Sequence, residues 1–226
     1  IKTDRLDYYD HEFESRDGYA YLVNTKDAIP VNIYMGVDLA YEATESSDYQ
    51  IIMVIGIDSD RNIYVIDYMR EHIPLYDMPE QILEYAREFS PVKRVNVEHV
   101  GAQGIIKDAV NSLSGKERKV APGIALGVRP PSGIKKEDRL ESLLAPIVNR
   151  RKMFIKRSHN SLVDEMFQFP KGKNDDILDG LWYAINKARP PVSKKFDALD
   201  FLENKTVKSV SKTTKRVISW VTGQKI

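Results

Sequence analysis

Residues 169–184 read Phe-Pro-Lys-Gly-Lys-Asn-Asp-Asp-Ile-Leu-Asp-Gly-Leu-Trp-Tyr-Ala and place three carboxylates at the start of an otherwise apolar helix. A loop with Pro and Gly leads into Asn174, which belongs to the favoured N-cap residues. The apolar residues that follow recur at helical spacing and predict a helix that begins at Asp175. Asp179 is one turn further along, and Asp176 lies beside the helix start.

These acids have two explanations. Negative side chains in a first turn complement the positive end of the helix dipole, and this effect needs no metal. Three carboxylates within five residues, next to an apolar face, exceed what the dipole requires. Carboxylate oxygens are also the ligands that hard divalent cations prefer. We therefore expect a metal site here, completed by acids from elsewhere in the chain.

Two further acids follow predicted strands. Residues 33–40 form a short apolar run with Asp38 near its carboxyl end, and residues 94–101 form a second β-rich run that leads to Glu98. A buried carboxylate is costly unless it is paired or binds metal. Functional groups of α/β sheets gather where strands end, so we expect Asp38, Glu98 and the acids that begin at Asp175 to converge.

The remaining segments predict a ribonuclease H-like α/β fold, a mixed β-sheet flanked by helices. Two apolar stretches flank a polar turn and predict a hairpin whose first strand is central in the sheet. The expected elements, in chain order, are strands over 33–38, 49–58 and 63–69, a helix over 77–89, a strand over 94–98, a helix from residue 102, a strand over 124–128, a helix over 135–149, a strand over 153–155 and a helix from 175 to about 188.

Three motifs together resemble the nuclease domain of the large terminase subunit of tailed bacteriophages, in the RuvC-like branch of the ribonuclease H superfamily. They are Gly-Val-Asp-Leu-Ala at 36–40, Val-Glu-His-Val-Gly at 97–101 and Asn-Asp-Asp-Ile-Leu-Asp at 174–179. The resemblance covers roughly residues 31–188 and depends on the order and spacing of the motifs. The chain departs from the pattern at Asn174, where many members have His.

The resemblance implies a metal-dependent endonuclease that cuts concatemeric double-stranded viral DNA during genome packaging. It assigns catalytic roles to Asp38, Glu98, Asp175 and Asp176, and adds Asp179 to the metal ligands. Two Mg²⁺ or Mn²⁺ ions are expected, with Asp38 bridging both, Glu98 on one and Asp175 or Asp176 on the other. Two such ions activate the attacking water and stabilise the leaving oxygen. The absence of Cys and of closely spaced His argues against a structural zinc site.

Basic residues near these acids are candidates for DNA binding. Lys171 and Lys173 flank the acidic helix, and Arg150, Arg151 and Lys152 form a cluster. Such groups would offset the repulsion between an acidic centre and DNA. Ordinary solvated surface charge is the competing explanation for all five.

Charge is unevenly distributed along the chain. Residues 189–226 carry nine Lys/Arg against three Asp/Glu, a balance of +6, whereas residues 1–188 carry 25 against 30, a balance of −5. We expect a basic C-terminal extension over 189–226, which either contacts DNA or the portal or is merely solvated. Residues 1–30 are expected to be a linker or an added edge element, and residues 31–188 the nuclease domain.

Length and composition fit one compact domain with appendages, since 226 residues are 42% hydrophobic and 30% charged. No apolar run approaches the roughly 20 residues of a membrane span, so no membrane partner is expected. The chain begins with Ile1 and contains no GxxxxGK[ST] loop. We therefore expect the chain to be a fragment of a longer polypeptide. The resemblance implies a packaging ATPase domain in that polypeptide, the portal and the small terminase subunit as partners, and the cytoplasm of the bacterial host as the location.

Two other functions remain open. A Holliday-junction resolvase or transposase-like nuclease of the same fold would use the same acids on branched or end-specific DNA. An actin/Hsp70-type nucleotide-binding module also has a first strand that ends in Gly-x-Asp, but it needs two such domains and Gly-rich phosphate loops. Cleavage that requires metal and no nucleotide would exclude the module.

Overall fold

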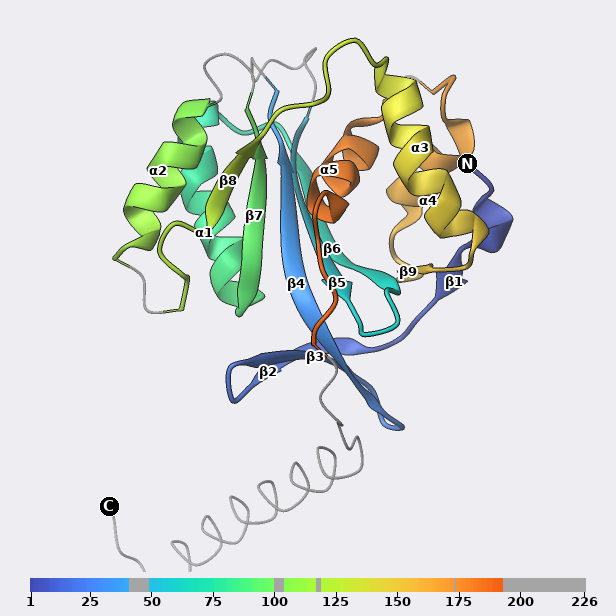
Figure 1. Ribbon diagram of the computed structural model, residues 1–226, viewed down its shortest axis with the longest axis horizontal. Coiled ribbons are helices and arrows are strands. Elements are labelled where there is room, and N and C mark those ends of the chain that lie inside the picture. Colours follow the sequence, from blue (N-terminus) through green and yellow to red (C-terminus); the bar gives the residue numbers. More distant parts are fainter. Residues whose placement is uncertain (41–48, 100–103, 117–118, 173, 193–226) are drawn as a thin grey trace, which may run out of the picture.

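A mixed β-sheet with helices on both faces forms the body of the molecule (Figure 1). The computed structural model of the chain describes residues 1–40, 49–99, 104–116, 119–172 and 174–192. Nine strands and five α-helices lie within these residues. The predicted α/β fold, a mixed sheet flanked by helices, is confirmed. None of the helices in these ranges has the length and apolar character that a membrane crossing requires.

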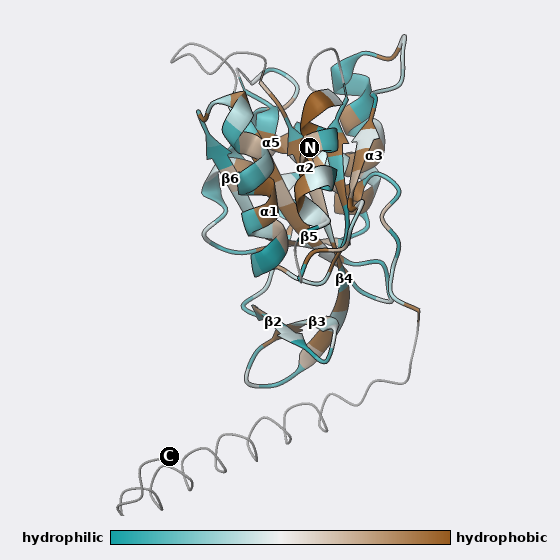
Figure 2. Ribbon diagram, turned by 90° about the vertical axis from the view of Figure 1, so that its left-hand side faces the viewer, coloured by the Kyte–Doolittle hydropathy of each residue, from teal (hydrophilic) through white to brown (hydrophobic). Residues whose placement is uncertain are grey.

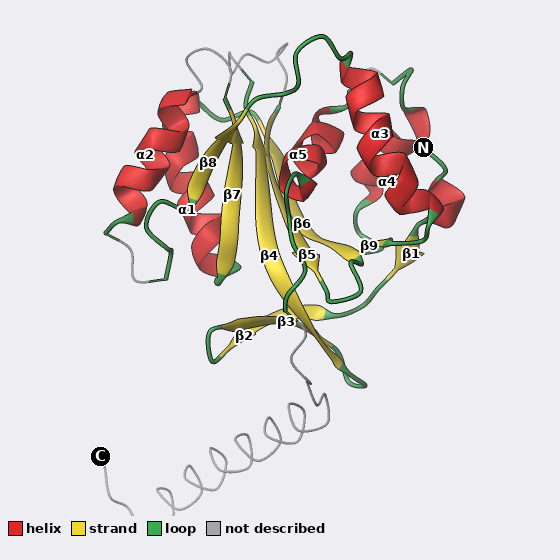
Figure 3. Ribbon diagram, in the orientation of Figure 1, coloured by secondary structure: helices red, strands yellow, loops and turns green. Residues whose placement is uncertain are grey.

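Six strands come first along the chain, and α-helices then alternate with strands until the last two α-helices, which are consecutive (Figure 3). The strands are β1 (Asp7–Tyr8), β2 (Glu12–Arg16), β3 (Tyr19–Val23), β4 (Ala28–Asp38), β5 (Gln50–Ile57), β6 (Ile63–Glu71), β7 (Val92–Glu98), β8 (Ala125–Val128) and β9 (Met153–Ile155). The α-helices are α1 (Met78–Glu88), α2 (Gly104–Ser114), α3 (Lys136–Asn149), α4 (Asn160–Gln168) and α5 (Asp176–Ile185), and 3₁₀ turns lie at Thr3–Arg5 and Leu75–Asp77.

Strand β4 is the centre of the sheet. Its first residues pair with β3, and its later residues pair antiparallel with β5 on one side and parallel with β7 on the other. Strand β8 continues the sheet parallel to β7, and β6, β9 and β1 continue it beyond β5. Because β4 and β7 run in parallel with Val37 opposite Val97, Asp38 and Glu98 end neighbouring strands at the same edge.

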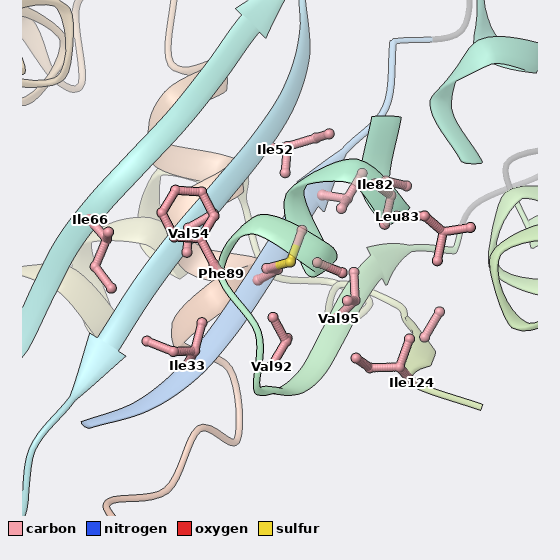
Figure 4. Close-up of a cluster of buried hydrophobic side chains, with 14 of the residues drawn as sticks. Ile33, Ile52, Val54, Ile66, Ile82, Leu83, Phe89, Val92, Val95 and Ile124 are labelled. Atoms are coloured by element: carbon pink, nitrogen blue, oxygen red, sulfur yellow. The ribbon is translucent and has the colours of Figure 1, made fainter. Parts of the chain in front are cut away.

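Alternation along the strands divides the core into two layers. Ile33, Met35 and Val37 of β4 point to the face that α1 and α2 cover, where they meet Ile52 and Val54 of β5 (Figure 4). Complete burial of each such side chain contributes about 1.5–3 kcal/mol relative to an exposed one. In Figure 2, where α1 and α2 face the viewer, both helices carry brown and teal stretches, as expected of helices that bury one side.

The opposite face of the sheet carries α3, α4 and α5 (Figure 1). All eight residues of β5 are buried, which confirms the predicted central position of that strand. All ten residues of α5 are buried as well. Gly36 allows this helix to lie directly on β4, since a Cβ at that position would stand 2.2 Å from both Ala184 N and Gly180 O.

Strand β7 holds the carboxyl end of α5 through polar side chains. Asn96, buried to 99%, donates from Nδ2 to the carbonyl oxygens of Tyr183 (2.7 Å) and Asn186 (2.9 Å). Arg94, two residues earlier on the same strand face, donates to the carbonyl oxygens of Asn186 (3.2 Å) and Lys187 (2.7 Å). These donors satisfy carbonyls that a helix end leaves without an internal partner. The face of β7 that leads to Glu98 is therefore built to fix α5.

Asn96→Ala is expected to lower the free energy of unfolding by about 1–3 kcal/mol, because buried carbonyl oxygens at the end of α5 lose their donor. Urea unfolding followed by circular dichroism measures this change. The matched control is Asn149→Ala, since Asn149 is exposed at the end of α3 and its replacement should change stability by less than about 0.5 kcal/mol. An equal loss in both variants would contradict the role of Asn96.

Three local expectations were wrong. Helix α5 ends at Ile185 and not near Ala188, because Asn186 leaves the helical conformation (ψ 116°) and Lys187 has a positive φ of 57°. Helix α4 was not expected; its nine residues contain too few turns for a clear helical period. Strand β4 begins at Ala28, before the predicted start.

Within residues 1–30, β1 pairs with β9 and the β2–β3 hairpin joins the start of β4, to which residues 28–30 already belong. The predicted start of a helix at residue 102 and most of the basic extension, residues 193–226, lie outside the described residues.

Candidate active site

The carboxylate of Glu98, at the end of β7, is held by two hydrogen bonds. Its Oε1 accepts a hydrogen bond from the Tyr183 hydroxyl (3.2 Å), and its Oε2 accepts one from the Leu39 N–H (3.4 Å). Both donors come from elements that pack on β7, namely α5 and the residue after β4. Tyr183 was not singled out from the sequence, because an aromatic residue on an apolar helix is indistinguishable there from ordinary core. The two donors orient the Glu98 carboxylate toward Asp38.

Asp38 lies in a strongly acidic environment. Burial raises the pKa of Asp38 well above its usual range, and the charges of Asp179 and Glu98 raise it further. Such coupling is strong only between groups a few ångströms apart, so β4, β7 and α5 each bring one carboxylate to the same centre. Asp38 and Glu98 remain partly exposed, whereas Asp179 is buried. Of the acids of α5, Asp179 is the one whose charge acts on Asp38, whereas we expected Asp175 to lie with Asp38 and Glu98.

Helix α3 supplies two cations to this centre. The Asp179 carboxylate forms close ion pairs with Lys136 and Arg139, and Lys136 Nζ also lies 2.7 Å from Asp175 Oδ1. Arg139 is buried, and its guanidinium lies 4.5 Å from the centre of the Trp182 ring. Burial opposes a charge on Lys136, but the carboxylates of Asp179 and Asp175 raise its pKa overall.

Lys136 and Arg139 were not identified as site residues from the sequence. They occupy positions i and i+3 of a helix whose expected range, 135–149, is otherwise confirmed. The available signal was this pair of basic residues on one helical face. The spacing of these two basic residues did not indicate which acids they contact, because α3 and α5 are far apart in the chain.

Asp176 faces a second charged group at the same edge of the sheet. Its Oδ2 lies 3.9 Å from Arg70 Nη2, and the same nitrogen lies 3.7 Å from Glu165 Oε1. Arg70 is opposite Ile51, which in turn is opposite Asp38, so this group is level with the acidic centre. The structure therefore joins Asp175 to Asp179 through Lys136 and directs Asp176 toward Arg70 and Glu165.

The expected N-cap of α5 was wrong. Asp175, not Asn174, is the N-cap residue, and its side chain makes no capping hydrogen bond. Glu165 of α4 takes this role, since its Oε2 accepts hydrogen bonds from the N–H groups of Ile177 (3.0 Å) and Leu178 (3.4 Å). A residue distant in sequence thus satisfies the helix donors, which frees the local acids for other partners.

Glu165 makes stability depend on pH. Burial raises the pKa of Glu165 to about 7 from an ordinary 4.5, so the folded protein retains a proton that the unfolded chain loses. Stability from this group is complete below pH 4.5 and is lost as the pH rises through about 7. We expect this loss, on the order of 3 kcal/mol, to shrink in Glu165→Gln.

Urea unfolding from about pH 5 to pH 8 measures this difference. Glu141→Gln is the control, since Glu141 is exposed on α3 and its replacement should leave the pH dependence of the free energy of unfolding unchanged. Identical pH profiles for Glu165→Gln and the wild type would contradict the prediction.

The predicted basic residues lie in two places. Lys171 is exposed in the loop before α5, and Lys173 lies outside the described residues. Arg150, Arg151 and Lys152 lie at the far end of α3 from Lys136, about 20 Å along a helix of this length. Arg151 pairs with Asp7 (3.1 Å) and Lys152 with Asn62 (2.9 Å). These three residues are not brought to the acidic centre.

The donor set matches the chemistry of Mg²⁺ or Mn²⁺. Carboxylate oxygens are hard ligands, and a centre in which neighbouring negative charges raise the pKa of Asp38 is short of positive charge. Within the described ranges, no three or more His, Cys, Asp or Glu residues are arranged as a metal site. Lys136 and Arg139 engage Asp179 instead. The carboxylates are thus of the ligand type that these ions prefer. For Asp179 to become a ligand, its ion pairs with Lys136 and Arg139 have to rearrange.

Comparison with known proteins concerns the fold. No protein-family model and no curated protein matches the sequence. The large terminase nuclease from thermophilic phage G20c, solved with bound zinc, is similar at a TM-score of 0.54 and 14% identity, over 83% of this chain and 96% of that chain. The P22 large terminase nuclease domain is similar at a TM-score of 0.52 and 13% identity, over 81% and 87%. The chain thus has the fold of phage large terminase nucleases, as its motifs predicted.

Proposed function

We propose that this chain is a metal-dependent endonuclease that cuts double-stranded viral DNA concatemers during genome packaging, by two-metal phosphodiester hydrolysis. The observation that carries the proposal is the convergence of Asp38, Glu98 and Asp179 from β4, β7 and α5 at one edge of the sheet. The fold that the chain shares with two phage terminase nucleases supports it.

The residues of the centre have separate tasks in this proposal. The charges of Glu98 and Asp179 both act on Asp38, which is the candidate bridge between two Mg²⁺ or Mn²⁺ ions. Asp175, joined to Asp179 through Lys136, is the next candidate ligand. When bound, the ions supply the charge that activates water and stabilises the leaving oxygen.

Two residues of α5 and its neighbours keep these ligands in place. Tyr183 orients the Glu98 carboxylate, and Arg139 orients that of Asp179. Asp176 retains a candidate role as a catalytic ligand, for which it has to leave Arg70.

We also propose the division of the chain into domains, its partners and its location. Residues 31–188 are the nuclease domain, residues 1–30 an added edge element and residues 189–226 a basic extension. The partners are double-stranded DNA, a packaging ATPase domain of the same polypeptide, the portal and the small terminase subunit, in the cytoplasm of the bacterial host. Lys171 and Lys173, next to α5, are candidates for contact with DNA at the acidic centre. Arg150, Arg151 and Lys152 would form a separate contact at the opposite end of α3.

Nicking and linearisation of supercoiled plasmid tests the activity, with Mn²⁺, Mg²⁺ or EDTA and without ATP. We expect cleavage with either ion and none with EDTA. Cleavage only with ATP would favour a nucleotide-binding module, and a strong preference for four-way junctions over linear duplex would favour a resolvase. No cleavage, together with no binding of Mn²⁺, would overturn the proposed function.

A further inference from the structure

Lys136 occupies the position among the acids where positive charge is needed. Its Nζ bridges Asp175 Oδ1, at 2.7 Å, and the Asp179 carboxylate. The same charge acts on Asp38, whose pKa it lowers against the larger effect of burial and of the neighbouring acids. One ammonium group thus faces carboxylates from β4 and from the first turn of α5.

The two cations of α3 differ in their freedom to move. The Arg139 side chain is 8% exposed, lies over the Trp182 ring and is enclosed by α5. The Lys136 side chain is 42% exposed at the first turn of α3. Its four-carbon stem is flexible, and a released ammonium is readily hydrated. Lys136 can leave the acids without disturbing the core, whereas Arg139 cannot.

We propose that Lys136 is an internal counter-ion, which holds Asp175 and Asp179 together in the metal-free protein and which a divalent cation must displace in order to bind. This inference rests on the proposed function, because it takes the acids to be metal ligands. A divalent cation carries twice the charge of the Lys136 ammonium, so the carboxylate oxygens bind the cation more strongly and the exchange is favourable. The cost of releasing the Lys136 ion pairs sets the ion concentration at which the centre fills.

The test is Mn²⁺ binding by isothermal titration calorimetry, paired with thermal unfolding in EDTA. Lys136→Met should bind Mn²⁺ at least about tenfold more tightly than the wild type and should unfold at a lower temperature in EDTA. Lys135→Met is the matched control, because Lys135 precedes Lys136 and forms no ion pair with any residue in the described ranges. Lys135→Met removes one positive charge near the acids but breaks none of their ion pairs. The dissociation constant of this variant for Mn²⁺ should therefore differ from the wild-type value by less than about twofold.

Lys136→Arg tests the role without loss of charge, and it should retain the wild-type dissociation constant and unfolding temperature to a large extent. Equal changes in Lys136→Met and Lys135→Met would overturn the proposal, since they would show a general field effect. Weaker Mn²⁺ binding by Lys136→Met would overturn it too. Plasmid cleavage by the wild type separates the two proposals: activity with an unchanged dissociation constant in Lys136→Met rejects the counter-ion and retains the nuclease.

Discussion

Asp38→Asn is expected to lower metal-dependent DNA cleavage by at least about a thousandfold, because the centre loses the acid on which the charges of both Glu98 and Asp179 act. The same substitution should raise thermal stability. The folded-state pKa of Asp38 is raised by burial, Asp179 and Glu98, so the stability that its protonated form contributes is lost as the pH rises. At about pH 8 the ionised carboxylate destabilises the folded state, and Asn removes that charge. Plasmid cleavage and thermal unfolding in EDTA measure both effects.

Asp58→Asn is the matched control for Asp38→Asn. Asp58 is a buried acid in the β5–β6 turn, and its carboxylate accepts four hydrogen bonds. The donors are the N–H groups of Asp60 and Asn62, the Asn62 amide and the Tyr64 hydroxyl. This carboxylate stabilises the turn, so its replacement should lower the free energy of unfolding by about 1–3 kcal/mol and leave cleavage intact.

The two acids are therefore expected to behave in opposite ways. Asp38→Asn protein that cleaves at the wild-type rate would refute the assignment of Asp38 to the centre. Loss of cleavage accompanied by a fall in the unfolding temperature would show instead that Asp38 supports the fold.

Gly36→Ala is expected to destabilise the folded protein by at least about 3 kcal/mol, since the added methyl group has no room. A Cβ at Gly36 would stand 2.2 Å from Ala184 N and from Gly180 O, and both are backbone atoms of α5. No side-chain rotation relieves this contact, so α5 has to move away from β4. That movement carries Asp179 away from Asp38, and cleavage should fall even where the protein remains folded. Urea unfolding and plasmid cleavage measure the two consequences.

Gly56→Ala, on the neighbouring strand β5, is the control for Gly36→Ala. A Cβ there would lie 3.3 Å from side-chain atoms of Ile66 and Val31, which can shift slightly. We expect a loss of about 1 kcal/mol and normal cleavage. Similar stability losses in both variants would show that the approach of α5 to β4 is not specially tight.

Much of the fold was predictable because local patterns agree with the tertiary arrangement. The buried strand β5, the hairpin to β6 and helix α1 each show the apolar period of their element and lie close to their expected ranges. Helix α4 lacked such a signal. The cap of α5 was misassigned because a local candidate, Asn174, competes with Glu165, which is distant in sequence and comes close only in the fold.

The sequence alone determined the type of fold and the presence of acids at the ends of two strands and the start of one helix. Apolar periodicity and the cost of a buried charge are local properties, and they are legible in the order of residues. Only the tertiary structure decided which acids meet. Gly36 sets α5 on β4 so that Asp179 reaches Asp38, while Arg70 and Lys136 draw Asp176 and Asp175 to different partners. Such pairings depend on distances between elements remote in the chain, for which residue order contains no direct signal.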